Sequence, residues 1–294
     1  MDVDRARGAL LGTLVGDGLG RPFEGASSGE RLDGAVAARL LRPRAWSHSD
    51  DGEMMLGVMR ALEEGGRIEE ARLLEVLARG HEPARGYGKG TRAAFRAWTA
   101  GASWQEAGQA AWPEGSRGNG GAVRGAPVVV WTLRGPEERA VEAARAACRA
   151  THAHAEALDG AVAVALATRR ELSGRPWSLE ELAERAPALA GPLREAEACQ
   201  SPAELLRRVG AGVLAAESVP AALWLARRAD SFEAAAREAI RLGGDTDSIG
   251  AMVGGVVGAR VGAAAIPAPW RAALEPGAER RVEAFLARAI ARTG

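Results

Sequence analysis

The chain has 294 residues, with 38 lysines and arginines balanced by 38 aspartates and glutamates, so its formal net charge is zero. This balance argues against a nucleic-acid partner, because proteins that bind the phosphate backbone carry a basic face. The 47% share of hydrophobic residues is enough for a packed core. The two cysteines, Cys148 and Cys199, fit no metal-binding spacing, so we expect reduced thiols and a cytoplasmic location.

Helical periodicity of the apolar residues dominates the chain. In residues 3–20 a glycine recurs at every fourth position from Gly8 to Gly20, which predicts a helix with one face of small residues for close packing. Residues 246–262 contain five glycines and predict a central helix that approaches neighbouring backbones closely. Further helices are predicted at 50–64, 67–79, 91–100, 137–149, 155–172, 201–216, 219–228, 231–242 and 278–292. Caps or first-turn signals are Ser103, Pro136, Ser178, Ser201 and Ser231.

One run, Val128 to Leu133, resembles a strand, but a single strand cannot build a sheet, so we assign it to a buried helix. The most apolar run, Ile249 to Ala265, is too short and too charged to span a bilayer, so we expect no membrane partner. Loops are expected at 21–34, 80–90, 113–121 and 187–200, and none is long enough to divide the chain. The sequence therefore predicts an all-α protein with a single compact domain over residues 1–294.

Two acidic runs lie far apart in the chain, each at the start of a predicted helix. The first is Ser49-Asp50-Asp51 and the second is Asp245-Thr246-Asp247-Ser248. Each run alone is also typical of a helix N-cap. Brought together, their carboxylates and hydroxyls would form an all-oxygen ligand set, which suits Mg²⁺, Mn²⁺ or Ca²⁺. The pair therefore indicates a metal-dependent enzyme, and two ions in such a site would resemble many hydrolytic centres.

Three other segments are candidates for the same site. Glu24 follows the glycine- and proline-rich end of the first helix and is either a general base for water or a plain loop residue. The glycine-rich segment 115–121 contains the only asparagine, Asn119, and its backbone N–H groups could hold a phosphate group. His152 and His154 could be metal ligands, a proton shuttle or helix-cap partners.

Segments along the whole chain resemble the ADP-ribosylglycohydrolase family, which includes the dinitrogenase-reductase-activating glycohydrolases. The matching segments are GALLGTLVGDGLGRPFE (8–24), SHSDDGEMML (47–56), GYGKGTRAAF (86–95), GNGGAVRGAP (118–127), THAHAEALDGA (151–161), SVPAALW (218–224) and GGDTDSIGAMVGG (243–255). The family often has threonine in place of Ser49 and of Gly52. The first exchange keeps the hydroxyl, whereas Gly52 is expected to loosen a contact behind the metal ligands.

This resemblance implies an all-α fold of the ADP-ribosylglycohydrolase type, with two Mg²⁺ or Mn²⁺ ions in a central cleft. It implies metal ligation by Ser49, Asp50, Asp51, Asp245, Asp247 and Ser248. It makes Glu24 a candidate acid/base or metal-gating carboxylate. The residues that would contact ADP-ribose are Ser116, Gly118, Asn119, Gly120 and His152.

The leading hypothesis is hydrolysis of the glycosidic bond at the anomeric carbon of ADP-ribose, with Glu24 and Asp51 as catalytic carboxylates. The product would be ADP-ribose released from a modified protein or a small conjugate, and the leaving group is left open. One alternative is a metal-dependent phosphohydrolase that acts on a nucleotide diphosphate. Another is a non-catalytic ADP-ribose-binding protein. We expect a monomer, because no long apolar stripe is left unassigned.

Overall fold

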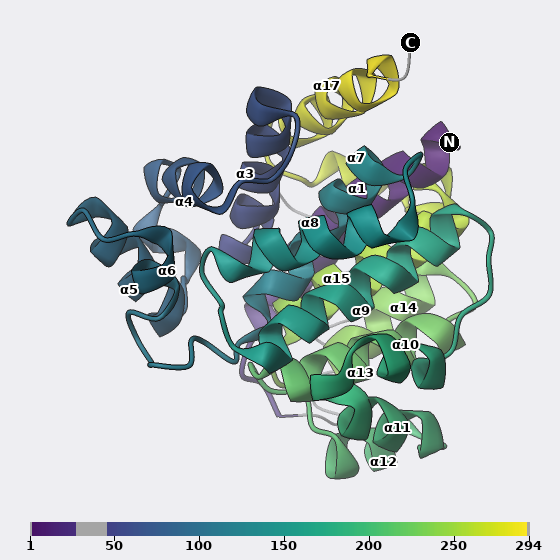
Figure 1. Ribbon diagram of the computed structural model, residues 1–294. Coiled ribbons are helices and arrows are strands. Elements are labelled where there is room, and N and C mark those ends of the chain that lie inside the picture. Colours follow the sequence, from purple (N-terminus) through teal and green to yellow (C-terminus); the bar gives the residue numbers. More distant parts are fainter. Residues whose placement is uncertain (1, 28–45, 293–294) are drawn as a thin grey trace.

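A pair of antiparallel helices forms the centre of the molecule. In the computed structural model, which describes residues 2–27 and 46–292, helix α1 (Val3–Gly20) packs along helix α15 (Thr246–Val261) (Figure 1). A β-carbon placed on Gly12 would lie 2.1 Å from the carbonyl oxygen of Gly254, and one on Gly8 would lie 2.2 Å from that of Gly258. The predicted glycine faces are therefore confirmed as the surface on which these two backbones meet.

This pairing determines where the ends of the two helices lie. Because the helices are antiparallel, the last turn of α1 lies beside the first turn of α15, and Thr246 Oγ1 donates a hydrogen bond to the Gly20 carbonyl over 2.9 Å. A short 3-10 helix, η1 (Arg21–Phe23), follows α1 directly. Glu24 therefore emerges next to the second acidic run.

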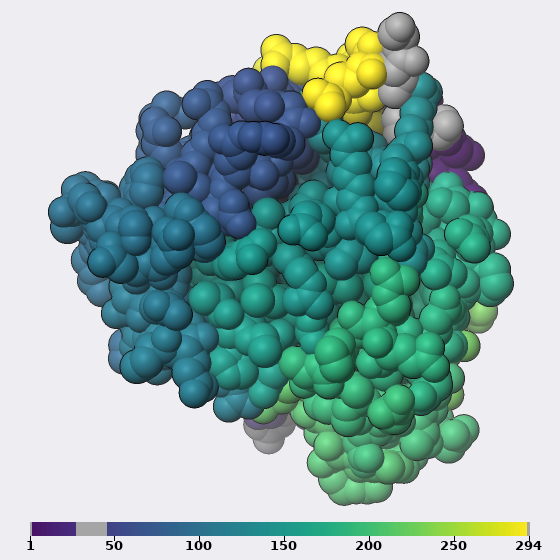
Figure 2. All heavy atoms as spheres, in the orientation of Figure 1, coloured from purple at the N-terminus to yellow at the C-terminus, as the bar shows by residue number. Residues whose placement is uncertain are grey.

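Other helices cover the central pair, and almost nothing of α1 is visible in the space-filling view (Figure 2). They include α3 (Asp50–Gly65), α7 (Gly125–Thr132), α8 (Glu137–Arg149), α9 (Ala155–Leu172), α13 (Ala215–Arg228), α14 (Phe232–Leu242) and α17 (Ala278–Ala291). The others are α4 (Glu70–Arg79), η2 (Pro83–Arg85), α5 (Lys89–Thr99), α6 (Trp104–Gly108), η3 (Asn119–Arg124), α10 (Leu179–Arg185), η4 (Pro187–Leu189), α11 (Ala190–Ala198), α12 (Pro202–Arg208), η5 (Ala263–Ala265) and α16 (Ala268–Ala272). Buried apolar residues from Ala6 to Ala289 join in one cluster, so the layers share a core.

The predicted all-α architecture is confirmed. Within 2–27 and 46–292 the only β pairing consists of three isolated bridges, and the strand-like residues 128–132 lie in α7. No helix in this described part is long and apolar enough to cross a membrane. All five predicted start signals directly precede a helix. The four serines among them each accept a hydrogen bond from a backbone N–H of the first turn. The five residues are Ser103, Pro136, Ser178, Ser201 and Ser231.

Two predictions of local structure were wrong. The helix predicted at 201–216 ends at Arg208, because Gly210 adopts a positive φ of 95° that a helix does not allow, and the chain then runs as an irregular link to Ala215. The loop predicted at 187–200 contains η4 and α11. Its prolines resembled loop punctuation, yet the first turn of a helix tolerates proline because its N–H groups have no partner inside the helix.

Candidate active site

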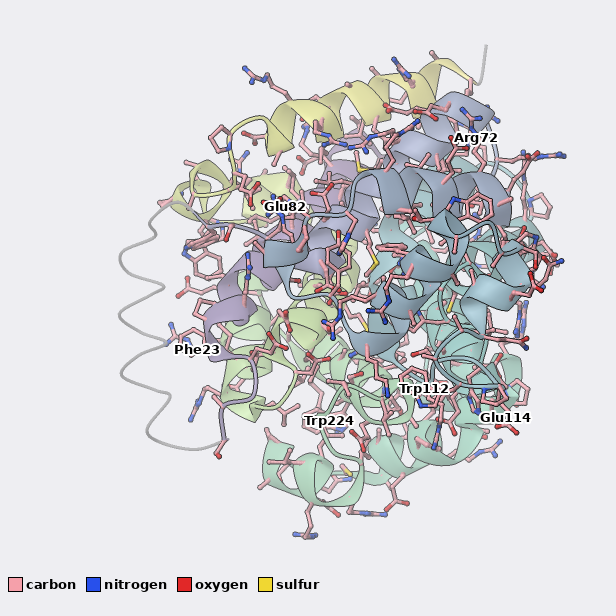
Figure 3. The ribbon with its side chains drawn as sticks, turned by 90° about the vertical axis from the view of Figure 1, so that its left-hand side faces the viewer. Phe23, Arg72, Glu82, Trp112, Glu114 and Trp224 are labelled. Atoms are coloured by element: carbon pink, nitrogen blue, oxygen red, sulfur yellow. The ribbon has the colours of Figure 1, made fainter. Side chains whose placement is uncertain are left out.

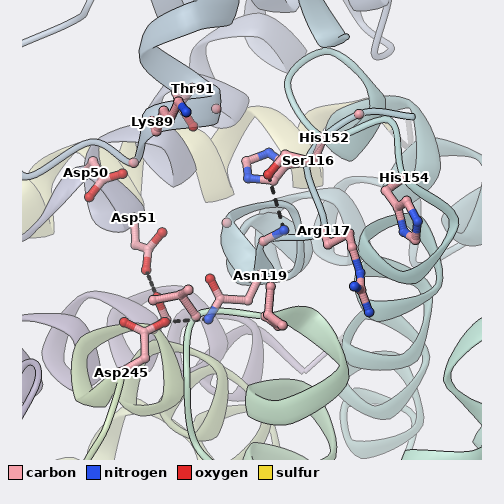
Figure 4. A pocket seen from close by; sticks show the side chains of 18 of the residues that line it. Asp50, Asp51, Lys89, Thr91, Ser116, Arg117, Asn119, His152, His154 and Asp245 are labelled. Carbon is pink, nitrogen blue, oxygen red and sulfur yellow. Dashed lines mark hydrogen bonds between the residues drawn. The ribbon is translucent and has the colours of Figure 1, made fainter. Parts of the chain in front are cut away.

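A cleft of about 720 Å³ opens where the first turns of α3 and α15 meet the glycine-rich loop (Figure 4). The predicted site residues in its lining are Glu24, Asp50, Asp51, Ser116, Gly118, Asn119, Gly120, His152, Asp245, Asp247 and Ser248. Ser49 is the predicted residue that lies behind the cleft wall and outside its lining. The structure therefore gathers segments from both ends of the chain around one cavity, as the sequence predicts.

The first acidic run is held in place by a buried aspartate of α1. Ser49 is the N-cap of α3, and its Oγ accepts a hydrogen bond from the Asp51 backbone N–H over 3.1 Å. Asp17 is fully buried and accepts from the backbone N–H of Ser49 at 3.0 Å and of Gly52 at 2.9 Å. Burial raises the pKa of Asp17, and the bond from Ser49 opposes that rise. The sequence alone predicted no role for Asp17, although it is the only charged residue within 8–20.

Gly52 has no room for a side chain. A β-carbon at this position would lie 2.5 Å from Asp17 Oδ2 and 2.7 Å from the β-carbon of His48. His48 is itself held between Glu53, 3.1 Å from its Nε2, and Glu275, 3.4 Å from its Nδ1. The looseness expected from a glycine is therefore not found here, because Asp17 and His48 fill the space that a larger residue would take.

The second acidic run meets both Glu24 and the first run. Carboxylate oxygens of Glu24, Asp245 and Asp247 lie within 4.8 Å of one another. Glu24 reaches this position because the residues after it pair with Gly244: the Gly25 N–H donates to the Gly244 carbonyl over 2.8 Å. Ser248 Oγ donates to Asp51 Oδ2 over 2.5 Å, which links the two runs directly.

The acidic residues raise one another's pKa values. Burial, followed by the charge of Asp17, raises the pKa of Asp50 to about 7. Burial, followed by the charges of Asp51 and Asp245, raises the pKa of Asp247 to about 10. Close buried carboxylates cannot all be ionised without a compensating positive charge. This oxygen-only set therefore fits hard divalent cations, which favour carboxylate ligands.

The glycine-rich loop is tied to the second acidic run. Asn119 Nδ2 donates to Asp245 Oδ2 over 2.5 Å and to Ser218 Oγ over 2.8 Å. The Asn119 backbone N–H donates to the Val213 carbonyl over 3.1 Å, in the link between α12 and α13. Asn119 therefore orients a predicted metal ligand as well as lining the cleft. Ser218 lies far away in the sequence, and no local pattern marked it as a partner.

The two histidines of the His-x-His pair have different surroundings. His152 is buried, and its Nδ1 lies 2.8 Å from Thr151 Oγ1. Burial, followed by the positive charge of Arg124, lowers the pKa of His152 to about 3. His154 is the N-cap of α9, and its Nδ1 accepts from the Glu156 N–H over 3.2 Å, so it has one of the three roles left open for this pair, that of a helix-cap partner.

The mouth of the cleft contains Trp112, Val213 and Lys89, which were not predicted from the sequence as site residues. Trp112 is 41% exposed and Val213 is 60% exposed, which makes them two of the three exposed large hydrophobic residues within the described ranges. Lys89 Nζ lies 5.5 Å from the centre of the Trp112 ring. Figure 3 shows Trp112 and Glu114 close together, away from Phe23 at the end of η1. A signal for Lys89 was present in the sequence, since it is the only lysine.

Comparisons with known proteins agree with this geometry. The family model for ADP-ribosylglycohydrolase matches residues 2–294. ADP-ribosylhydrolase ARH3 of Danio rerio is 28% identical over 326 residues, which cover 94% of this chain and 87% of that protein. The ADP-ribosyl-[dinitrogen reductase] glycohydrolase of Rhodospirillum rubrum is 27% identical over 294 residues, which cover 95% of this chain and 93% of that protein.

A solved structure shares the fold as well. It is described as an ADP-ribosylglycohydrolase-related protein complex, and it superposes with a TM-score of 0.73 at 30% identity, covering 97% of this chain and 96% of its own. The family match over almost the full chain, the relatives and the shared fold agree with one another. The chain therefore belongs to the ADP-ribosylglycohydrolase family.

Proposed function

We propose that this protein is a metal-dependent hydrolase that cleaves the glycosidic bond at the anomeric carbon of ADP-ribose and releases ADP-ribose from a modified protein or a small conjugate. Membership of the ADP-ribosylglycohydrolase family supports the hydrolase activity. The observation that carries the proposal is the meeting of both acidic runs with the glycine-rich loop in one cleft of about 720 Å³. That volume lies within the usual range for small-molecule sites.

We further propose that the site holds two Mg²⁺ or Mn²⁺ ions. The ligands would be Ser49, Asp50, Asp51, Asp245, Asp247 and Ser248. The raised pKa values of Asp50 and Asp247 support this, because each reflects a carboxylate that a nearby cation would stabilise. The Ser49 hydroxyl already accepts one hydrogen bond, but its oxygen has a second lone pair to offer. When bound, such ions would lower the pKa of water and hold the ribose hydroxyls.

The carboxylates would supply the remaining chemistry. Departure of the leaving group builds positive charge on the ribose ring, which the Asp51 carboxylate can stabilise. Glu24 is exposed, unlike the aspartates of the two acidic runs, and can reach a water molecule. Burial and the charge of Asp245 raise the pKa of Glu24, and a higher pKa makes it a better base toward that water. Glu24 is accordingly the candidate acid/base or metal-gating residue.

The glycine-rich wall of the cleft would hold the diphosphate and the nearer ribose. The contributing residues would be Ser116, Gly118, Asn119, Gly120 and His152. Backbone N–H groups of a glycine-rich loop that opens a helix suit phosphate oxygens. The hydrogen bond from Asn119 to Asp245 would place this wall beside the metal ligands.

A product assay tests the proposed function. Purified protein is incubated in Mg²⁺ or Mn²⁺ with ADP-ribose joined to arginine, serine, nucleic acid or an O-acyl group, and products are identified by mass spectrometry. Free ADP-ribose from at least one linkage is expected. AMP with ribose phosphate would favour the phosphohydrolase, and binding of ADP-ribose with no product would favour a non-catalytic protein. Asp247→Asn should abolish release, whereas exposed Asp230→Asn should not.

We also propose that the protein acts as a monomer, with one domain over residues 1–294, in the cytoplasm. Both cysteines are free and buried, which suits a reducing compartment. Size-exclusion chromatography with light scattering should give a mass near 30.6 kDa, and a dimer mass would contradict the monomer.

A further inference from the structure

A buried arginine lies behind the wall of the cleft without a carboxylate partner. Arg124 is 0% exposed, and no ion pair to it is found in the described part of the chain. Its Nη1 donates to the Ala147 carbonyl over 2.9 Å, and its Nη2 contacts Met54 Sδ at 3.2 Å. Nη2 also donates to Thr151 Oγ1 over 2.8 Å. A buried charge that forms no direct ion pair is costly, so its retention needs an explanation.

The bond to Thr151 determines where the hydroxyl proton of Thr151 points. A guanidinium group can only donate hydrogen bonds, so Thr151 Oγ1 must be the acceptor in that contact. The hydroxyl keeps one proton of its own. Among the residues that the structure describes, the other partner of this oxygen is Nδ1 of His152, at 2.8 Å. The proton of Thr151 is therefore directed at Nδ1.

This direction decides which nitrogen of His152 carries a proton. The depressed pKa of His152 means that its ring is neutral at pH 7 and has one N–H. Because Nδ1 accepts from Thr151, that N–H is on Nε2. The opposite tautomer would direct two donors at Thr151 Oγ1 and leave the hydroxyl proton without an acceptor.

The Nε2 atom faces the glycine-rich loop. It would lie 3.3 Å from a β-carbon on Gly118 and 3.3 Å from one on Gly120, so a side chain at either position would cover it. The Ser116 hydroxyl oxygen would lie at the same 3.3 Å from a β-carbon on Gly118, and Figure 4 shows Ser116 beside His152 at the cleft. An N–H at Nε2 would attract a phosphate oxygen, whereas a lone pair there would repel it.

We propose that Arg124 is a positioning residue that acts through Thr151 to fix His152 as the Nε2–H tautomer, so that this N–H donates to a phosphate oxygen held at the glycine-rich loop. The identity of the ligand rests on the proposed function, but the tautomer does not. Arg124 itself is not among the residues that line the cleft. Its effect passes through two hydrogen bonds to a residue that does.

The test uses Thr151, because a change at fully buried Arg124 could prevent folding. Thr151→Val removes the hydroxyl and keeps the shape of the side chain, and Thr151→Ser keeps the hydroxyl. Thr168→Val is the matched control, since Thr168 is equally buried and its hydroxyl donates to the Val164 carbonyl within α9. The readouts are the ¹⁵N shifts of the His152 ring in the ligand-free protein and calorimetric titration with ADP-ribose.

In the wild-type protein we expect a protonated Nε2 and a bare Nδ1. Thr151→Val should lose this preference and bind ADP-ribose about tenfold more weakly, as for one lost hydrogen bond, while Thr151→Ser and Thr168→Val should keep both. A proton on Nδ1 of the wild type, or an unchanged tautomer and affinity in Thr151→Val, would overturn the inference. Wild-type protein with the expected tautomer but no affinity for ADP-ribose would instead overturn the proposed function and leave the tautomer supported.

Discussion

Ser248 donates a hydrogen bond from Oγ to Oδ2 of Asp51 across 2.5 Å, although the two residues are 197 positions apart in the chain. Each lies in the first turn of a helix, Asp51 in α3 and Ser248 in α15. Helix N-termini carry partial positive charge and stabilise carboxylates, so two of them pointing at one cleft can hold more acids than either alone. The bond fixes the distance between the two acidic runs.

We therefore predict that Ser248→Ala weakens divalent-cation binding. The bond from Ser248 opposes the rise in the pKa of Asp51, so its loss should raise that pKa further and make the carboxylate a poorer ligand. We expect the dissociation constant for Mg²⁺ to rise by about tenfold or more, as measured by calorimetry. Ser248→Thr keeps the hydroxyl and should bind normally. Equal affinity in Ser248→Ala and wild type would show that the contact is dispensable.

Addition of metal should separate the wild type from Asp247→Asn. With a chelator present we expect similar melting temperatures, because the pKa of Asp247 near 10 keeps its side chain protonated at pH 7 and asparagine resembles that form. With Mg²⁺ at about 100 times its dissociation constant, the wild type should gain about 2.7 kcal/mol of unfolding free energy.

The same variant should also differ in metal content. Elemental analysis should find two ions per wild-type chain and fewer in Asp247→Asn or Asp50→Ala. Asp230→Asn, at an exposed position, should match the wild type in both measurements. Unchanged metal content in both site variants would refute the dinuclear centre.

Local sequence patterns predicted the parts of the fold that depend on local spacing. Glycines four residues apart lie on one face of a helix wherever that helix packs, so the close contact of α1 with α15 could be anticipated from Gly8 to Gly20. The break after Arg208 could not, because the alanines and leucines around it favour helix and only the conformation of Gly210 opposes it.

The candidate site, too, could be predicted only in part from the sequence. The acidic runs and the glycine-rich loop could be recognised because each is compact in the sequence. Asp17 and Ser218 could not, since each acts through hydrogen bonds to residues elsewhere in the chain: Asp17 accepts from the N–H groups of Ser49 and Gly52, and Ser218 accepts from the side-chain amide of Asn119. Such partners are determined only when the helices pack.

The glycine contact of the central pair can be tested with Gly12→Ala. The new methyl group would lie 2.1 Å from the Gly254 carbonyl oxygen, and because the methyl group is fixed to one backbone and the oxygen belongs to the other, the two helices must separate. We expect a loss of about 1–3 kcal/mol in the free energy of unfolding, measured in urea. Mg²⁺ binding should weaken too, since Glu24 and Asp247 are placed by the ends of these helices.

Gly191→Ala is the matched control for this substitution. Gly191 lies in α11 with no atom within 4 Å of an added β-carbon, so alanine should stabilise the helix by up to about 1 kcal/mol. If both variants changed stability by the same amount and in the same direction, the close contact of α1 with α15 would not be the cause.

His152 should make the protein sensitive to acid. Its pKa is about 3 in the folded protein, against an ordinary value of 6.5, because burial and Arg124 disfavour the charged ring. Below pH 6.5 the unfolded chain therefore takes up a proton at His152 that the folded chain does not. The stability that the folded protein has with a neutral His152 is fully present above pH 6.5, and it is lost as the pH falls from 6.5 toward 3.

This difference predicts that His152→Gln loses less stability in acid than the wild type does. Between pH 7 and pH 5 the wild type should lose about 2 kcal/mol more unfolding free energy than the variant, as measured by urea titration at each pH. The buried aspartates titrate in both proteins, so the comparison of the two slopes cancels their effect. His154→Gln, which alters the less buried histidine of the pair, serves as the control. Parallel slopes for His152→Gln and wild type would mean that His152 is not held neutral.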